Sequence, residues 1–458
     1  MLAAWGRAMS TCVNVSYGPR ALALGEWLVL GLLTWRLFTW VAVLEDRTDQ
    51  SDFVVFYVAG SRFAHGLSPY GFVLKAGDSF YNPPWFALLL VPFSFLSVET
   101  ASLCWLALSL GLLVVSVTLA QRLCDLRLGF RKLAILCLAL TWWRPVSEHL
   151  ALGQSSLIVS VCTFAAILAV RRGHFRLAGL TLVIAASKPQ LLFLLGLGMT
   201  IWEWRRQRSF GVLAGFAIGI AAVLLICLAI TPAWVHDLLP RPEAVGAHID
   251  TMTLLQTAFG QKLAVEALYI SIFLLGSAAT LLYWARSEAQ LVYLACLTIP
   301  ATLVLTPYAQ LHDYVVLVFP LMLIAAKSSA VPASWWVAVH VVLPSWVVVS
   351  LDFWFHRGVE QEGMWRWLQS RLGEQRSAWL WEQSQWNWRF IAMLLPLGIV
   401  VYLLSSTGRR LAHFSVENGA TASTNIRSPA PPPTTWTGSS RGRSLASFLS
   451  RTLPSSNW

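Results

Sequence analysis

The chain has 458 residues, of which 57% are hydrophobic and only 12% carry a charge. A soluble domain carries about 25% charged residues, so this composition excludes a globular protein with a single anchor and indicates a membrane protein with many spans. The net charge of +11 does not point to nucleic acid, because the Arg residues gather in short loops between apolar segments, as they do in cytoplasmic loops of membrane proteins.

The chain is expected to begin with a cytoplasmic N-terminus over residues 1–22, which holds Arg7 and Arg20 but no apolar run. The first span would then be an uncleaved signal-anchor. Residues 23–405 are predicted to form an all-α polytopic membrane domain of about 12 transmembrane helices. The apolar segments that could span are 23–44, 84–97, 100–120, 133–143, 155–170, 177–187, 190–202, 210–230, 264–285, 289–306, 314–327, 334–352 and 388–405.

Several of these segments are shorter than the roughly 20 residues of a full crossing. Short or broken helices persist at membrane depth only where they are buried in protein or line a polar cavity. Because the short segments concentrate between residues 84 and 202, we expect several short or re-entrant helices and a polar cavity in that part of the chain.

Basic residues set the expected orientation of the loops. The basic loops, placed in the cytoplasm, are 122–132, 171–176, 202–208 and 406–410. The connections then left outside are 45–83, 144–154, 187–190, 231–257, 307–313 and 353–386. In this scheme one of the segments 84–97 and 100–120 is re-entrant. The alternative places 122–132 outside and lets 177–202 cross once; the charge bias favours the first scheme.

Two further segments have a distinctive composition. Residues 353–386 read equally as an amphipathic helix in the outer interface and as a solvated loop rich in Trp. Residues 406–458 are basic and rich in Ser and Pro, so they cannot bury a core and are expected to be a disordered cytoplasmic tail.

The sequence offers no familiar metal or nucleotide motif. It contains no GxSxG, HExxH, Walker or GxGxxG element, and its seven cysteines form no CxxC pair and lie mostly in apolar segments, as packing residues do. Arg, Lys and His with scattered carboxylates suit an anionic ligand better than a metal. No metal site and no cofactor are therefore predicted.

Lys188, in the tripeptide Lys188-Pro189-Gln190, stands between two apolar half-length segments. A lysine at membrane depth costs several kcal/mol unless it pairs or faces water, so it is a functional candidate. Pro189 would break the helix and free backbone groups to line a cavity. The alternative is a lysine that snorkels to the outer interface.

His312 and Asp313 open a later apolar segment and suggest a cationic group held by a carboxylate. Neighbouring residues on a helix do not face each other, so the spacing alone favours a polar pair that ends a helix.

The first external loop, residues 45–83, begins with four carboxylates, of which Asp52 precedes an apolar stretch that could form an interfacial helix. Asp52 or Ser51 would cap that helix. A carboxylate at the water boundary could equally serve as a general base for a bound hydroxyl. The residue types alone leave both readings open.

A set of short motifs between residues 45 and 330 resembles glycosyltransferase family 87 of the GT-C superfamily. In chain order the motifs are Asp52-Phe-x-x-Phe-Tyr57-x-Ala59, Gly66-x-x-Pro69-Tyr70, Tyr81-x-Pro83-Pro84-x-x-Ala87, Gly153-Gln154-x-x-Leu157, Ala178-Gly179-Leu180, Lys188-Pro189-Gln190 and Pro307-Tyr308-x-x-x-His312-Asp313. The chain departs from the family pattern at Asn82, and the tail beyond about residue 406 has no counterpart.

The resemblance implies a GT-C-like bundle in the plasma membrane that faces the extracytoplasmic side with its active site. It implies transfer of a hexose, with mannose as the first candidate, from a polyprenyl-monophosphate sugar to a glycolipid or glycan acceptor, with inversion and without a metal. Asp52 would be the general base. The implied substrate-binding residues are Arg62, Tyr70, Tyr81, Gln154, Lys188, Gln190, His312 and Asp313; among these, Lys188, His312 and Arg62 would hold the lipid phosphate, and Tyr70, Tyr81 and Gln154 would line the sugar pocket.

Two other classes of function compete with this reading. A transporter or flippase of a lipid-linked sugar would show an internal repeat and ionisable residues near the middle of its spans. The main charges of that kind are Glu26 and Arg36, and no repeat is visible. A non-catalytic membrane scaffold would not depend on Asp52 or Lys188.

Overall fold

The computed structural model describes most of the chain between residues 52 and 327. The described residues are 27–28, 30–32, 34–35, 52–72, 74, 79–238, 255–256, 263–306, 309–327, 370–371, 373 and 395–404. The chain divides into the units Met1–His413 and Phe414–Trp458, and every described residue belongs to the first. The expectations for the N-terminus, the tail, most of the first span, most of residues 353–386 and the acids before Asp52 fall outside the described residues.

Every regular element in the described part of the chain is helical, which confirms the all-α prediction. The α-helices are α3 (Asp52–Ala64), α4 (Pro84–Leu90), α5 (Val98–Leu123), α6 (Phe130–Leu140), α7 (Arg144–Leu152), α8 (Ser156–Arg171), α9 (Phe175–Ala185), α10 (Phe193–Gln207), α11 (Gly211–Ile230), α12 (Trp234–Leu238), α14 (Leu263–Arg286), α15 (Leu291–Leu305) and α16 (Val318–Lys327). The 3₁₀ helices are η2 (Val91–Phe95), η3 (Pro189–Leu191) and η4 (Leu311–Leu317).

Three of these helices, α5, α11 and α14, are long and apolar enough to cross a membrane. A fourth span results if α7 and α8, which meet at a bend of 119°, are taken together. The described residues therefore indicate a membrane protein but do not confirm the predicted number of about 12 spans. The remaining apolar helices are shorter: Pro84–Phe95, Phe175–Ala185, Leu291–Leu305, Leu311–Ala326 and Leu395–Leu404.

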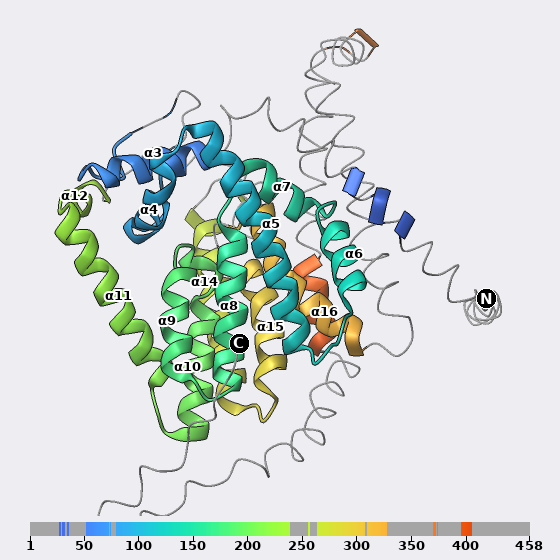
Figure 1. Ribbon diagram of the computed structural model, residues 1–458. Helices are drawn as coiled ribbons and strands as arrows, with labels where there is room; N and C mark the ends of the chain where they lie inside the picture. The colour runs from blue at the N-terminus through green and yellow to red at the C-terminus, as the bar shows by residue number, and fades with distance from the viewer. Residues whose placement is uncertain are drawn as a thin grey trace, which may run out of the picture. The chain divides into compact units, whose positions relative to one another are not determined.

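Helices α5 and α8 lie side by side and run in the same direction (Figure 1). Near their starts, Trp105 Nε1 donates to the carbonyl oxygen of Gly153 at 2.8 Å. At their ends, Arg171 Nη1 donates to the carbonyl oxygen of Leu123 at 3.2 Å. These contacts define two ends of the helix pair, which we call the Lys188 end and the Arg171 end.

Segment 84–97 folds back as α4 and η2, which pack on α3 instead of continuing into α5. The contact is close: a Cβ at Gly60 of α3 would lie 2.9 Å from the backbone carbon of Leu90. By contrast, α5 is one continuous helix of 26 residues. This arrangement favours the scheme in which 84–97 is the segment that does not cross.

The described cysteines are all free, and most are buried as expected for packing residues.

Helices α9 and α11 approach each other through small residues. A Cβ added to Gly215 would overlap the carbonyl oxygen of Arg176, and one added to Gly179 would overlap that of Val212. In a membrane, where apolar side chains gain little by leaving lipid, such close backbone contact is a main source of helix association. The glycines therefore fix α11 against α9 and, through α9, against α8.

We expect Gly215→Ala to lower the free energy of unfolding by about 1–3 kcal/mol, because the methyl group has no room and the backbones of α9 and α11 must separate. Thermal unfolding of the full chain in detergent measures the effect. Gly111→Ala on α5 is the matched control, since a Cβ there meets nothing within 4 Å. Equal unfolding temperatures for the two variants would contradict the packing argument.

Candidate functional site

The turn between α7 and α8 begins the candidate site. Gly153 ends α7 in the left-handed conformation (φ 67°), and the chain resumes as α8 at Ser156. This bend brings the first turn of α8, otherwise a buried apolar helix, to the Lys188 end with its hydroxyl groups buried. Ser156 Oγ donates to Asp313 Oδ1 at 2.7 Å.

Lys188 lies in the break between α9 and α10, where its non-helical backbone (φ −127°, ψ 77°) precedes η3. Its side chain is only 9% exposed, so it does not snorkel to the surface. Nζ donates to Asp313 Oδ1 at 2.6 Å and to Ser156 Oγ at 2.9 Å, and it lies 3.1 Å from Nε2 of His312. Pro189 breaks the helix as predicted and leaves Lys188 directed into this cluster.

His312 and Asp313 both belong to η4, and both side chains reach Lys188. The tighter winding of a 3₁₀ helix changes the directions in which neighbouring side chains point relative to an α-helix. Asp313 also forms a capping box, because its Oδ2 accepts the backbone N–H of Gln310 at 3.0 Å. The helix-end reading of the sequence is therefore right for Asp313, and the same carboxylate also pairs with the lysine.

Helix α7, in the connection 144–154 that was expected outside, adds two side chains that the sequence analysis did not assign to the site. Glu148 Oε1 lies 3.9 Å from Nδ1 of His312. His149 is fully buried, lies within electrostatic reach of Lys188 and His312, and has no hydrogen-bond partner for either ring nitrogen among the described residues. The sequence signal was a Glu-His pair six and five residues before Gln154, respectively, within a helix of nine residues.

Asp52 begins α3 and contacts the same turn. Gln154 Nε2 donates to Asp52 Oδ2, so the amide orients the carboxylate. Gln154 and Ser156 are two residues apart in the chain. The turn thus contacts Asp52 through Gln154 and the Lys188–Asp313 ion pair through Ser156.

An aromatic cluster holds α3 in this position. The ring of Trp105 on α5 packs against Phe53 and Phe93, with centroids 5.3 and 5.4 Å apart. Its indole N–H donates to the Gly153 carbonyl oxygen. A Cβ at Gly153 would lie 2.6 Å from Cβ of Phe53, so glycine is required both by the backbone and by the close approach of α3.

The other predicted binding residues lie outside the Lys188 cluster, and their proposed roles stay predictions. Arg62 donates to the carbonyl oxygens of Ser68 at 2.8 Å and Tyr70 at 3.1 Å, which orders the loop after α3. Tyr70 is buried, and its hydroxyl donates to the Asn82 carbonyl oxygen at 3.0 Å.

The last two predicted binding residues, Tyr81 and Gln190, are both accessible to solvent. Tyr81 is 45% exposed and Gln190 is half-buried. Within the described part of the chain, no group of three His, Cys, Asp or Glu side chains is arranged to hold a metal ion.

The comparisons with known proteins give one match. The model of glycosyltransferase family 87 matches residues 80–307. No curated protein and no solved structure matches significantly. The matched segment includes Gln154 and Lys188, whereas Asp52 lies 28 residues before its start and His312 five residues after its end.

Gly153→Ala should lower the free energy of unfolding by more than the left-handed backbone alone would cost, because the methyl group also collides with Phe53. We expect a loss of about 1–3 kcal/mol beyond that of the control. The matched control is Gly173→Ala, which has a similar backbone (φ 81°) but open space around the new methyl group. Thermal unfolding compares the two; a loss no greater than that of Gly173→Ala would contradict the role assigned to Phe53.

Lys188→Met should destabilise the chain by about 3–5 kcal/mol, because it leaves the Asp313 carboxylate buried without its cation. The double variant Lys188→Met/Asp313→Asn should recover most of this loss. Its amide oxygen still accepts from Gln310, and no charge is left unpaired. Unfolding of the single and double variants in detergent measures the difference. A double variant as unstable as Lys188→Met would show that the ion pair does not dominate.

Proposed function

Because the chain belongs to glycosyltransferase family 87, it is a glycosyltransferase, and we propose that it uses a polyprenyl-monophosphate sugar as donor. The transferred sugar is a hexose, with mannose as the first candidate, and the acceptor is a glycolipid or glycan. The observation that carries the proposal is the pair of contacts made by the α7–α8 turn: Gln154 orients the Asp52 carboxylate, and Ser156 contacts a buried ammonium with an imidazole beside it.

In the proposed reaction the acceptor hydroxyl attacks the anomeric carbon from the side of Asp52. The hydroxyl proton passes to the carboxylate, which Gln154 holds in place. The bond between the anomeric carbon and the phosphate oxygen breaks, and the phosphate leaves with the bonding electrons. Attack and departure on opposite faces of the sugar give inversion.

The leaving phosphate gains negative charge on the Lys188 side. The ammonium of Lys188 is already fixed by Asp313 and Ser156, so it need not be reorganised as the charge develops. His312 lies beside it, and the unpartnered ring of His149 offers a further donor. Burial strengthens each of these interactions relative to water.

The distribution of basic residues supports a site on the extracytoplasmic side of the membrane. The ends of α5, α8 and α10 carry basic residues in their last turns, among them Arg122, Arg171 and Arg205. Positively charged loops favour the cytoplasm, which would leave the Lys188 end outside.

The test of the donor is transfer by the full chain in membranes supplied with radiolabelled polyprenyl-phosphate mannose or polyprenyl-phosphate arabinose. The membrane glycolipids serve as acceptors. Labelled product from the mannose donor supports the proposal. Product from arabinose alone overturns the choice of a hexose, and no product from either donor overturns the donor class.

Asp52→Asn should lower the transfer rate by about 10²–10⁴-fold, because the amide cannot accept the proton, while the unfolding temperature stays near that of the original chain. Glu99→Gln, at an exposed carboxylate in the first turn of α5, is the control and should leave the rate unchanged. A near-normal rate for Asp52→Asn would remove Asp52 from the reaction without affecting the donor assignment.

A further inference from the structure

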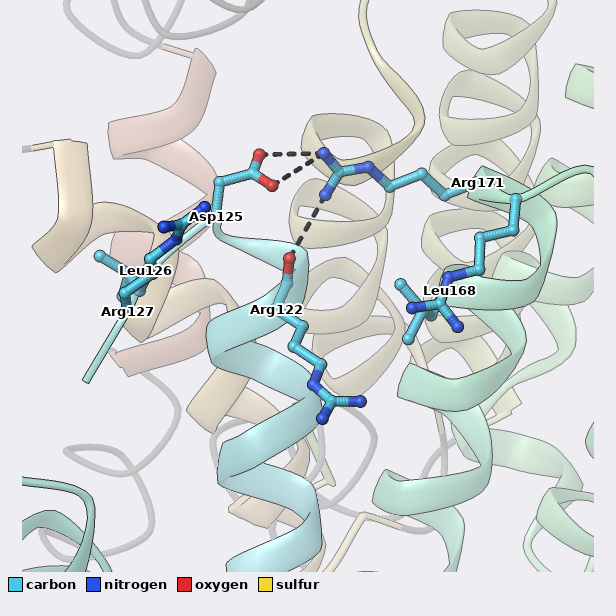
Figure 2. A pocket seen from close by; sticks show the side chains of 7 residues that line it. Arg122, Asp125, Leu126, Arg127, Leu168 and Arg171 are labelled. Atoms are coloured by element: carbon cyan, nitrogen blue, oxygen red, sulfur yellow. Dashed lines mark hydrogen bonds and ion pairs between the residues drawn. The ribbon is translucent and has the colours of Figure 1, made fainter. Parts of the chain in front are cut away.

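A cavity of about 570 Å³ lies at the Arg171 end, away from the proposed reaction site. It opens between the end of α5 and the end of α8 (Figure 2). Its lining combines four guanidinium groups, one carboxylate and two leucines. The residues are Arg122, Asp125, Leu126, Arg127, Leu168, Arg171 and Arg172, and we call this set the arginine pocket.

One arginine of the pocket, Arg171, links the end of α8 to the end of α5. Arg171 Nη2 donates to both carboxylate oxygens of Asp125 at 2.9 and 3.0 Å, and its Nη1 donates to the carbonyl oxygen of Leu123 at 3.2 Å. Figure 2 shows this side chain reaching from α8 to the end of α5. The single carboxylate of the pocket is therefore already compensated.

The other three arginines have no such partner. For the side chains of Arg122, Arg127 and Arg172, the structure gives no hydrogen bond or ion pair within the part of the chain that it describes. Three guanidinium groups beside one neutralised carboxylate form a strongly positive concavity. Planar guanidinium groups bind phosphate oxygens through paired hydrogen bonds, so the pocket suits a phosphate group.

The position of the pocket indicates where this phosphate comes from. Arg171 is 15 residues along α8 from Ser156, which corresponds to a rise of roughly 22 Å. That distance approaches the thickness of the hydrocarbon core, about 30 Å. With the Lys188 cluster at one end, the arginine pocket lies near the opposite membrane surface, at the level of lipid headgroups.

Apolar surface adjoins the charged groups. Leu126 and Leu168 line the pocket itself, and Phe130 in the segment after α5 is 83% exposed. The neighbouring face of α5 exposes Val114 and Val115. A ligand with a phosphate and acyl chains matches this combination, whereas a free anion would use only the guanidinium groups.

We propose that the arginine pocket binds the headgroup of an anionic phospholipid in the leaflet at the Arg171 end. The phosphate lies among Arg122, Arg127 and Arg172, and the acyl chains run along the exposed apolar face of α5. The lipid thereby bridges the ends of α5 and α8, next to the Arg171–Asp125 ion pair. This site is independent of the proposed sugar transfer.

The experiment titrates the full chain in detergent with dioctanoyl phosphatidylglycerol and detects bound lipid by native mass spectrometry. The variant Arg122→Gln/Arg172→Gln removes two guanidinium groups and leaves the Arg171–Asp125 pair intact. We expect its dissociation constant for phosphatidylglycerol to rise by roughly tenfold or more. The control Arg206→Gln/Arg208→Gln removes the same charge at the end of α10 and should change the constant by less than about threefold.

Two further titrations separate the sources of phosphate. Dioctanoyl phosphatidylcholine should bind more weakly than phosphatidylglycerol, and glycerol 3-phosphate should bind more weakly than either lipid. Equal losses in the two double variants would show a diffuse positive surface and overturn the pocket. Glycerol 3-phosphate binding as tightly as the lipid, or no preference for the anionic lipid, would overturn the lipid assignment.

Discussion

The buried ion pair between Lys188 and Asp313 is the constraint on which the arrangement of the Lys188 end depends. An ammonium in a medium of low dielectric constant costs several kcal/mol unless a carboxylate and further hydrogen bonds compensate it. The ammonium stands in the break before η3, and its compensation comes from two other parts of the chain, the start of α8 and the start of η4. Each of these is a point where a helix is interrupted. The interruptions between α7 and α8, before η3 and at η4 therefore bring polar side chains together inside an apolar bundle.

A second, apolar constraint couples Asp52 to this centre. The carboxylate belongs to α3, which contributes no charge to the ion pair and is held instead by aromatic packing around Trp105. Trp105 contacts α3 with its ring and the Gly153 carbonyl with its N–H, so one side chain fixes both partners of the Asp52–Gln154 hydrogen bond. The absence of a side chain at Gly153 is what lets Phe53 approach. Polar geometry at the site thus depends on tight packing of large apolar groups several residues away.

The sequence predicted the helices and their breaks better than it predicted the contacts between distant segments. The helical class and the break at Pro189 follow from local hydrophobicity and proline chemistry, and the structure bears them out. The cost of a charge in an apolar segment singled out Lys188, which the structure buries, while its role in the reaction stays a prediction. Contacts between distant segments leave no such local signal. Nothing in the spacing shows that Gln154 meets Asp52, which is 102 residues away, or that Arg62 donates to nearby carbonyl oxygens. His149 was visible as a polar residue, but its burial beside Lys188 follows from the bend of α7 against α8, which only the fold supplies.

The contact of one turn, between α7 and α8, with both an acid and a cation has a consequence for the proposed transfer. A polyprenyl-monophosphate sugar carries one negative charge on its phosphodiester, and the phosphate that leaves carries a second. Asp52 loses one negative charge when it accepts the hydroxyl proton, so the net charge of the buried site stays constant while charge moves from the Asp52 side to the Lys188 side. A site of low dielectric constant resists a change in net charge far more than a displacement of charge toward fixed donors. Because Asp313 already balances Lys188 in the resting site, the ammonium contributes most where the extra charge arrives, in the transition state and not in the bound substrate.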